Sequence, residues 1–156
     1  MGVEIERKFR VPDPPRWLSE CRSEAIDQGY VAIAEGGEEV RLRRVEGSSA
    51  VLTVKRGVGE ERLEVEIELA DEQFRALWPL TEGRRLEKRR HLVEGEPAIE
   101  VDVYGGELEG LVIAESEFPS VEASHRFDPP DWLGEELTGD AGYANQQLAL
   151  RGLPTG

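Results

Sequence analysis

Two carboxylates and an ammonium group recur at every second position near the amino terminus. Glu4, Glu6 and Lys8 alternate with other residues, so in a β-strand their three side chains would lie on one face. Carboxylate oxygens suit a hard divalent cation, and a neighbouring ammonium group suits an anion bound to that cation. The stretch therefore fits a metal ion that is bound together with an anionic substrate. A half-solvated strand whose polar face only meets water shows the same alternation.

Later segments repeat this alternation, and each carries charges of mainly one sign. The basic segments are 39–45, 50–56 and 86–93, and the acidic ones are 62–69, 98–104 and 111–118. Their charged face contains few Ser, Thr or Gln residues, which are common on solvated strands. Separate groups of cations and carboxylates suit a site that binds phosphates beside a metal ion, so we expect this face to lie inside the fold. The alternative is the solvated face of an open sheet.

Strands must hold these charged side chains, and turns rich in Gly and Ser separate the strands. Strands are expected over 3–11, 26–33, 39–45, 50–56, 62–69, 86–93, 98–104 and 111–118. Helices are expected over about 13–25, after Asp71, within 119–126 and over about 141–150. The pattern predicts an α+β fold in which eight antiparallel strands form a closed β-barrel with helices packed outside.

Length and composition restrict the class of protein. The 156 residues are expected to form one domain, 1–156, and a net charge of −14 disfavours nucleic-acid and membrane partners. The single cysteine, Cys21, excludes an internal disulfide and is typical of a reducing cytoplasm. No secretory signal or long apolar run is visible, so a cytoplasmic location is expected. Any anionic substrate therefore needs a local basic site.

The ordered set of motifs resembles the CYTH domain, the triphosphate tunnel metalloenzymes, and within it the short bacterial single-domain branch. Glu4, Glu6 and Lys8 match the ExExK signature, which is weak when it stands alone. The other matching motifs are Gln28-Gly29-Tyr30, Arg41-x-Arg43, Thr53-x-Lys55, Arg62-x-Glu64-x-Glu66, Lys88-x-Arg90, Glu100-x-Asp102, Glu115-x-Glu117 and Tyr143-x-Asn145. Ser116 and Gly142 depart from the family pattern, which puts a tail contact at position 142 in question.

The resemblance implies a tunnel in which Mg²⁺ or Mn²⁺ assists hydrolysis of an inorganic or simple organic triphosphate, with a C-terminal helix at one end. The implied substrate-binding residues are Lys8, Arg41, Arg43, Lys55, Lys88 and Arg90. The implied metal ligands are Glu4, Glu6 and Glu117 for one ion, and Asp102 and Glu115 for a second. Arginine and lysine can surround phosphate oxygens directly, whereas carboxylates reach phosphates only through metal ions.

Tyr30 and Glu66 are the candidate catalytic residues. The resemblance makes Tyr30 a candidate proton acceptor, but an ordinary phenol has a pKa near ~10, and packing inside the barrel is the alternative. Glu66 belongs to the acidic run over 62–69, whose charges equally suit pairing with cations across the lumen.

Three other functions share these residues. In a class IV adenylate cyclase a ribose hydroxyl replaces water as the nucleophile, and in a thiamine triphosphatase the substrate carries an organic group. A polyphosphate- or nucleotide-binding module is the non-enzymatic alternative. The clustered carboxylates argue against that module, because a pure anion binder has no use for repelling charges. The sequence leaves the oligomeric state open, including a homodimer.

Overall fold

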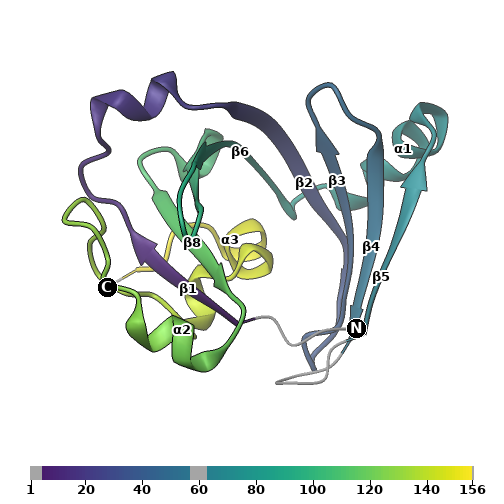
Figure 1. Cartoon of the computed structure of the whole chain (residues 1–156). Coiled ribbons are helices and arrows are strands. Elements are labelled where there is room, and N and C mark those ends of the chain that lie inside the picture. The colour runs from purple at the N-terminus through teal and green to yellow at the C-terminus, as the bar shows by residue number, and fades with distance from the viewer. Residues whose placement is uncertain (1–4, 57–62, 156) are drawn as a thin grey trace.

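One antiparallel sheet dominates the fold in a computed structural model of the chain, which describes residues 5–56 and 63–155 (Figure 1). The sheet has eight strands in the order β1-β8-β7-β6-β2-β3-β4-β5. The strands are β1 Ile5–Arg10, β2 Ser23–Ile33, β3 Glu39–Val45, β4 Ala50–Arg56, β5 Leu63–Leu69, β6 Arg85–Val93, β7 Ile99–Tyr104 and β8 Val112–Phe118. This confirms the predicted eight-stranded antiparallel sheet.

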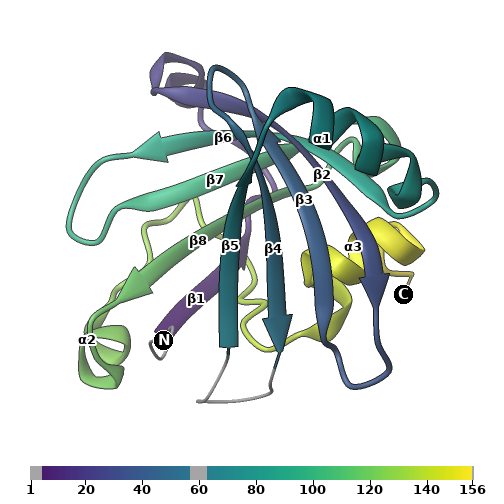
Figure 2. The same ribbon diagram turned by 90° about the vertical axis from the view of Figure 1, so that its right-hand side faces the viewer.

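The sheet curves strongly around a concave face, with β1 and β5 as its two edges (Figures 1 and 2). Within residues 5–56 and 63–155 no backbone ladder joins β1 to β5. The predicted closure of the sheet into a barrel is therefore not confirmed. The period-two alternation places the predicted charged residues of successive strands on the concave face and their apolar neighbours on the convex face.

Helices cover two parts of the convex face, as predicted. Helix α1, Asp71–Leu77, packs Phe74 against Leu42 and Leu69. The 3₁₀ helix η1, Arg16–Glu20, contributes to a second apolar cluster made of Phe9, Val11, Leu18, Ile99, Val101, Val112, Ala114 and Leu133. The remaining short elements are η2 Trp78–Thr81, η3 Gly106–Leu108, α2 Val121–Arg126 and η4 Ala141–Tyr143. No helix in the described ranges is long and apolar enough to cross a membrane.

The C-terminal helix lies on the concave side of the sheet (Figure 1). Helix α3, Asn145–Arg151, buries Leu148 in an apolar cluster that also contains Tyr30, Leu86 and Tyr104. These partners come from β2, β6 and β7, so α3 is packed against several strands at once. Apolar residues replace charged ones at this end of the concave face, and α3 therefore has an apolar surface on which to pack.

The helix predicted over about 13–25 is wrong. Only Arg16–Glu20 is helical, as a 3₁₀ helix, and β2 already begins at Ser23. Ser23 pairs with His91 of β6, so ladder hydrogen bonds draw residues after 22 into the sheet. Long-range pairing outweighs the local helical pattern here, because each residue added to a ladder satisfies backbone polar groups that a short helix leaves unpaired.

The helix predicted over about 141–150 is divided at Ala144. Residue 144 is extended, with φ −67° and ψ 139°, and it separates η4 from α3. Asp140 does cap a helix start, since its side chain accepts a hydrogen bond from the Gly142 amide at 3.0 Å. The break redirects the chain, so that α3 lies against the concave face.

Within the part of the chain that the structure describes, no helix covers the convex side of β5 over most of its length. Leu63, Val65 and Ile67 are 43%, 43% and 52% exposed, whereas Leu69 at the end of β5 is buried under α1. The expectation that helices cover the whole apolar exterior is therefore wrong for this edge strand.

Candidate active site

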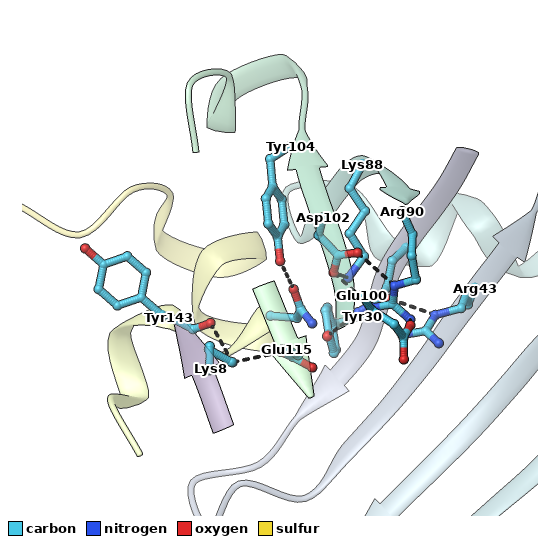
Figure 3. Close-up of polar contacts among 12 residues, drawn as sticks. Lys8, Tyr30, Arg43, Lys88, Arg90, Glu100, Asp102, Tyr104, Glu115 and Tyr143 are labelled. Atoms are coloured by element: carbon cyan, nitrogen blue, oxygen red, sulfur yellow. Dashed lines mark hydrogen bonds and ion pairs between the residues drawn. The ribbon is translucent and has the colours of Figure 1, made fainter. Parts of the chain in front are cut away.

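Asp102 on β7 lies at the centre of a buried group of charges on the concave face (Figure 3). Its Oδ2 is 2.9 Å from Lys88 Nζ, and its Oδ1 accepts a hydrogen bond from Arg90 Nε at 2.8 Å. Arg90 Nη2 donates a further bond to Oδ2 at 2.9 Å. Burial by itself raises the pKa of Asp102, but Lys88 and Arg90 outweigh it and hold the pKa at about 2. The carboxylate therefore stays ionised and orients two predicted phosphate-binding cations.

Lys88 is the more deeply buried of these two cations, with 4% of its surface exposed. Burial lowers its pKa to about 8, although Asp102 acts in the opposite direction. Arg90 reaches a second carboxylate, since its Nη1 is 2.9 Å from Glu100 Oε2. The two cations thus share Asp102 of β7, which is the neighbour of β6 in the sheet.

Arg43 on β3 is held differently, by a neutral side chain. Its Nε donates to Gln28 Oε1 at 2.9 Å, and Gln28 Nε2 donates to the Tyr30 hydroxyl at 2.7 Å. No carboxylate lies within 4.0 Å of the guanidinium among the described residues. Burial, with the nearby charges of Arg41 and Arg90, lowers the pKa of Arg43 to about 10. A buried positive charge that has no carboxylate this close among the described residues suits an anionic ligand.

Arg41 and Glu39 form a loose pair at the same end of β3. Their closest atoms, Arg41 Nη1 and Glu39 Oε2, are 3.8 Å apart, and both side chains are about nine-tenths buried. Arg41 Nε and Glu39 Oε2 have no hydrogen-bond partner among the described residues. Sequence reasoning assigned no role to Glu39, although its spacing of two from Arg41 was the signal for a shared face. Lys55 of β4 lies opposite Glu39 in the ladder.

Those predicted metal ligands that the structure describes lie on three neighbouring strands, β1, β8 and β7. Glu6 lies opposite Glu117 in the β1–β8 ladder, and Glu115 lies opposite Glu100 in the β7–β8 ladder. Glu4 lies outside the described residues. Like charges that face each other across strands are unfavourable unless a cation lies near. Within 5–56 and 63–155, however, no three acidic, His or Cys side chains converge as a ready-made metal-binding group.

The tail that follows β8 contacts this charged face from one end. Lys8 Nζ is 3.4 Å from Glu115 Oε1 and donates to the Tyr143 carbonyl oxygen at 3.2 Å (Figure 3). The Tyr104 hydroxyl donates to Asn145 Oδ1 at 2.6 Å, so β7 is tied to α3 as well. The tail contact at the Gly142 position is made by its neighbour, because the Tyr143 hydroxyl and ring both contact Arg10 of β1.

A family model described as the CYTH domain matches residues 2–148. The chain belongs to this family. Two relatives named inorganic triphosphatase are similar to it over 151 residues: the Nitrosomonas europaea protein is 43% identical, covering 95% of this chain and 97% of the relative, and the Acetivibrio thermocellus protein is 40% identical, covering 95% and 94%. A crystal structure named as an inorganic triphosphatase is 40% identical, has a TM-score of 0.76 and covers 96% of each chain.

Tyr30 of this CYTH domain is a poor proton acceptor at neutral pH. Burial, followed by the charge of Glu39, raises its pKa to about 12, against the smaller opposing effect of Arg41. Its oxygen also accepts a hydrogen bond from Gln28. The phenol therefore stays protonated at neutral pH, and the role of Tyr30 as a base stays a prediction beside the packing and hydrogen-bonding alternative.

Glu66, the other predicted catalytic residue of the CYTH domain, lies on the exposed edge strand β5. It is opposite Thr53 of β4, and the neighbouring Glu64 is opposite Lys55. No hydrogen bond or ion pair of Glu66 is found within the described residues. Its catalytic role remains a prediction.

An acid-stability measurement tests the role of Asp102. With its pKa lowered to about 2 from 3.8 in the folded protein, Asp102 stabilises the fold fully above pH 3.8 and loses this contribution as the pH falls to 2. The contribution is ~2 kcal/mol. We expect the stability gap between wild type and Asp102→Asn in urea unfolding to narrow between pH 4 and pH 2. The control Asp27→Asn breaks an exposed pair with Arg44 and should show little gap. If the difference in unfolding free energy between wild type and Asp102→Asn stays constant from pH 4 to pH 2, this stabilising role of Asp102 is contradicted.

Proposed function

We propose that this CYTH domain hydrolyses the terminal phosphoryl group of inorganic triphosphate with the help of a divalent metal ion. The observation that carries the proposal is the buried Arg43 guanidinium, whose hydrogen-bond partner among the described residues is the neutral Gln28. Such a charge is costly unless an anion arrives to pair with it. The relatives named inorganic triphosphatase, at 40–43% identity over nearly the full chain, support the choice of triphosphate as that anion.

The proposed phosphate cradle consists of the six cations predicted from the sequence: Lys8, Arg41, Arg43, Lys55, Lys88 and Arg90. Four strands, β1, β3, β4 and β6, supply them, so they surround the concave face rather than line one side of it. Arginine can bind two phosphate oxygens at once through its planar fork, and lysine supplies a compact charge. Asp102 holds Lys88 and Arg90 in place before the substrate arrives.

The proposed metal ligands are Glu6, Glu115 and Glu117, together with Glu4, which precedes Glu6 by two positions. Their fit rests on the ladder, which places Glu6 opposite Glu117 on neighbouring strands. Oxygen donors of this kind suit Mg²⁺ or Mn²⁺, which also take phosphate oxygens and water as ligands. When bound there, the metal neutralises charge on the triphosphate and makes a bound water more acidic. Both Asp102 oxygens are engaged by Lys88 and Arg90, so we assign Asp102 to positioning rather than to the metal.

We further propose that the curved sheet closes into a barrel around the bound substrate. The edges β1 and β5 both border the concave face, and β5 turns Glu64, Glu66 and Glu68 toward it. A metal–triphosphate complex lies between cations and carboxylates, so it would draw strands that carry both charges toward each other. Helix α3 already fills one end of this space, which favours a substrate without a bulky organic group at that end.

One assay tests the proposed function. Phosphate release is measured for inorganic triphosphate, ATP and thiamine triphosphate with Mg²⁺ and with Mn²⁺, and cyclic AMP is measured in the ATP samples. We expect metal-dependent release from inorganic triphosphate and little product from the other two substrates. In parallel samples with a non-hydrolysable triphosphate and Mg²⁺, amide exchange along β1 and β5 should slow if the sheet closes. Turnover of ATP to cyclic AMP, or no release from triphosphate with either metal, would overturn the proposal.

A further inference from the structure

Gln28 is a fully buried polar side chain at the contact between β2 and β3. Its exposed fraction is 0%, and the ladder places it directly opposite Arg43. Both ends of its amide are used: Oε1 accepts from Arg43 Nε at 2.9 Å, and Nε2 donates to the Tyr30 hydroxyl at 2.7 Å. A buried amide satisfied in this way is held in one orientation.

The hydrogen-bond partners also determine which end of the Gln28 amide faces Arg43 and which end faces Tyr30. Arginine has only donors, so Arg43 must face the carbonyl oxygen of Gln28, and the NH₂ group must face Tyr30. The Tyr30 oxygen therefore accepts, and its own proton is free to be donated elsewhere. At the same time Arg43 uses Nε for Gln28, and its Nη atoms make no hydrogen bond within the described residues.

Arg43 differs from the neighbouring cations because its hydrogen-bond partner, Gln28, is neutral. Lys88 and Arg90 are 2.9 and 2.8 Å from Asp102, which balances part of their charge. Among the described residues, no carboxylate lies within 4.0 Å of the Arg43 guanidinium, although Arg43 too lies among buried groups. A carboxylate at position 28 could also accept from Arg43, but it could not donate to Tyr30 as the amide does. It would also place a negative charge directly on Arg43, which the amide does not.

We propose that Gln28 is a positioning residue for triphosphate binding. It holds Arg43 through Nε, leaves the two Nη groups and the full positive charge for a phosphate, and makes Tyr30 a hydrogen-bond donor. This inference rests on the proposed function and adds to it a residue that touches no substrate. It explains why a neutral side chain is buried among so many charged ones.

The variant Gln28→Glu tests this role, because it keeps the shape and can accept hydrogen bonds from both Arg43 and Tyr30. We expect triphosphate affinity, measured calorimetrically with Mg²⁺ and a non-hydrolysable triphosphate, to fall about 10- to 100-fold, which is the effect of one charge-assisted contact. The melting temperature without ligand should stay the same or rise. The matched control is Gln73→Glu on α1, which adds the same charge far from Arg43 in the sequence and can still accept from the Ala70 amide.

A second variant separates positioning from packing. Gln28→Met fills the space but removes both hydrogen bonds, so melting temperature and affinity should fall together. If Gln28 only fills the core, Gln28→Glu should also lose stability and affinity in parallel. Wild-type affinity in Gln28→Glu would overturn the inference and leave the proposed function standing. A wild-type protein that does not bind triphosphate would overturn both.

Discussion

Glu6→Gln is expected to reduce turnover about 10³-fold, the scale seen when a group that stabilises the reacting charge is removed, and to leave much of the triphosphate affinity. Glu6 shares a ladder position with Glu117, so its loss removes one of two facing carboxylates that fit a divalent cation. The cations of β3 and β6 are untouched by this change. Phosphate release and calorimetric binding, each measured over a range of Mg²⁺ concentrations, separate the two effects.

Arg43→Ala should show the opposite pattern, with affinity for triphosphate reduced about 100-fold because a charge-assisted contact is lost. The control for charge is Glu122→Gln, which alters only an exposed pair with Arg126 on α2.

Full activity of Glu6→Gln at low Mg²⁺ would show that the carboxylates of β1 do not hold the metal. Unchanged affinity in Arg43→Ala would remove the observation on which the proposed function rests.

Removal of the tail after Thr138 is expected to lower both stability and turnover. The deletion takes away Leu148, which is 1% exposed, and the Tyr143 carbonyl contact of Lys8. It also opens one end of the concave face to water, which weakens the electrostatic interactions of the site. Misplaced binding groups reduce rates by about 100-fold, and we expect turnover per folded molecule to fall by that amount.

Leu148→Ala is the control that separates a closing role of the tail from simple packing. The cavity should destabilise the protein by ~3 kcal/mol and leave the helix in place, so turnover per folded molecule should stay near wild type. Tyr143→Ala removes the ring that contacts Arg10 and should show a smaller loss of turnover than the deletion. Wild-type turnover per folded molecule in the truncated protein would show that α3 only stabilises the fold.

The amino-acid sequence alone determined the strands, the composition of the charged face and the family. Alternation with period two is a local property, so Glu6, Lys8, Arg41 and Arg43 could be assigned to one face without knowledge of the pairing. The same local pattern predicted a helix over 13–25, and this was wrong, because the ladder between β2 and β6 already begins at Ser23. It also missed the break at Ala144, since the position of α3 depends on residues of distant strands.

Only the tertiary structure decided which charges are paired and which are not. Asp102 was predicted as a metal ligand, yet register places both Lys88 and Arg90 on its oxygens. Gln28 belonged to a motif that matched the family, but the sequence did not show its role, because its partner Arg43 lies on the neighbouring strand β3. The perturbed pKa of Tyr30 depends on burial and on Glu39, neither of which can be read from neighbours in the chain. Pairing, burial and hydrogen-bond direction depend on contacts between segments that are distant in the sequence. A local pattern of residues does not show which of these segments come into contact.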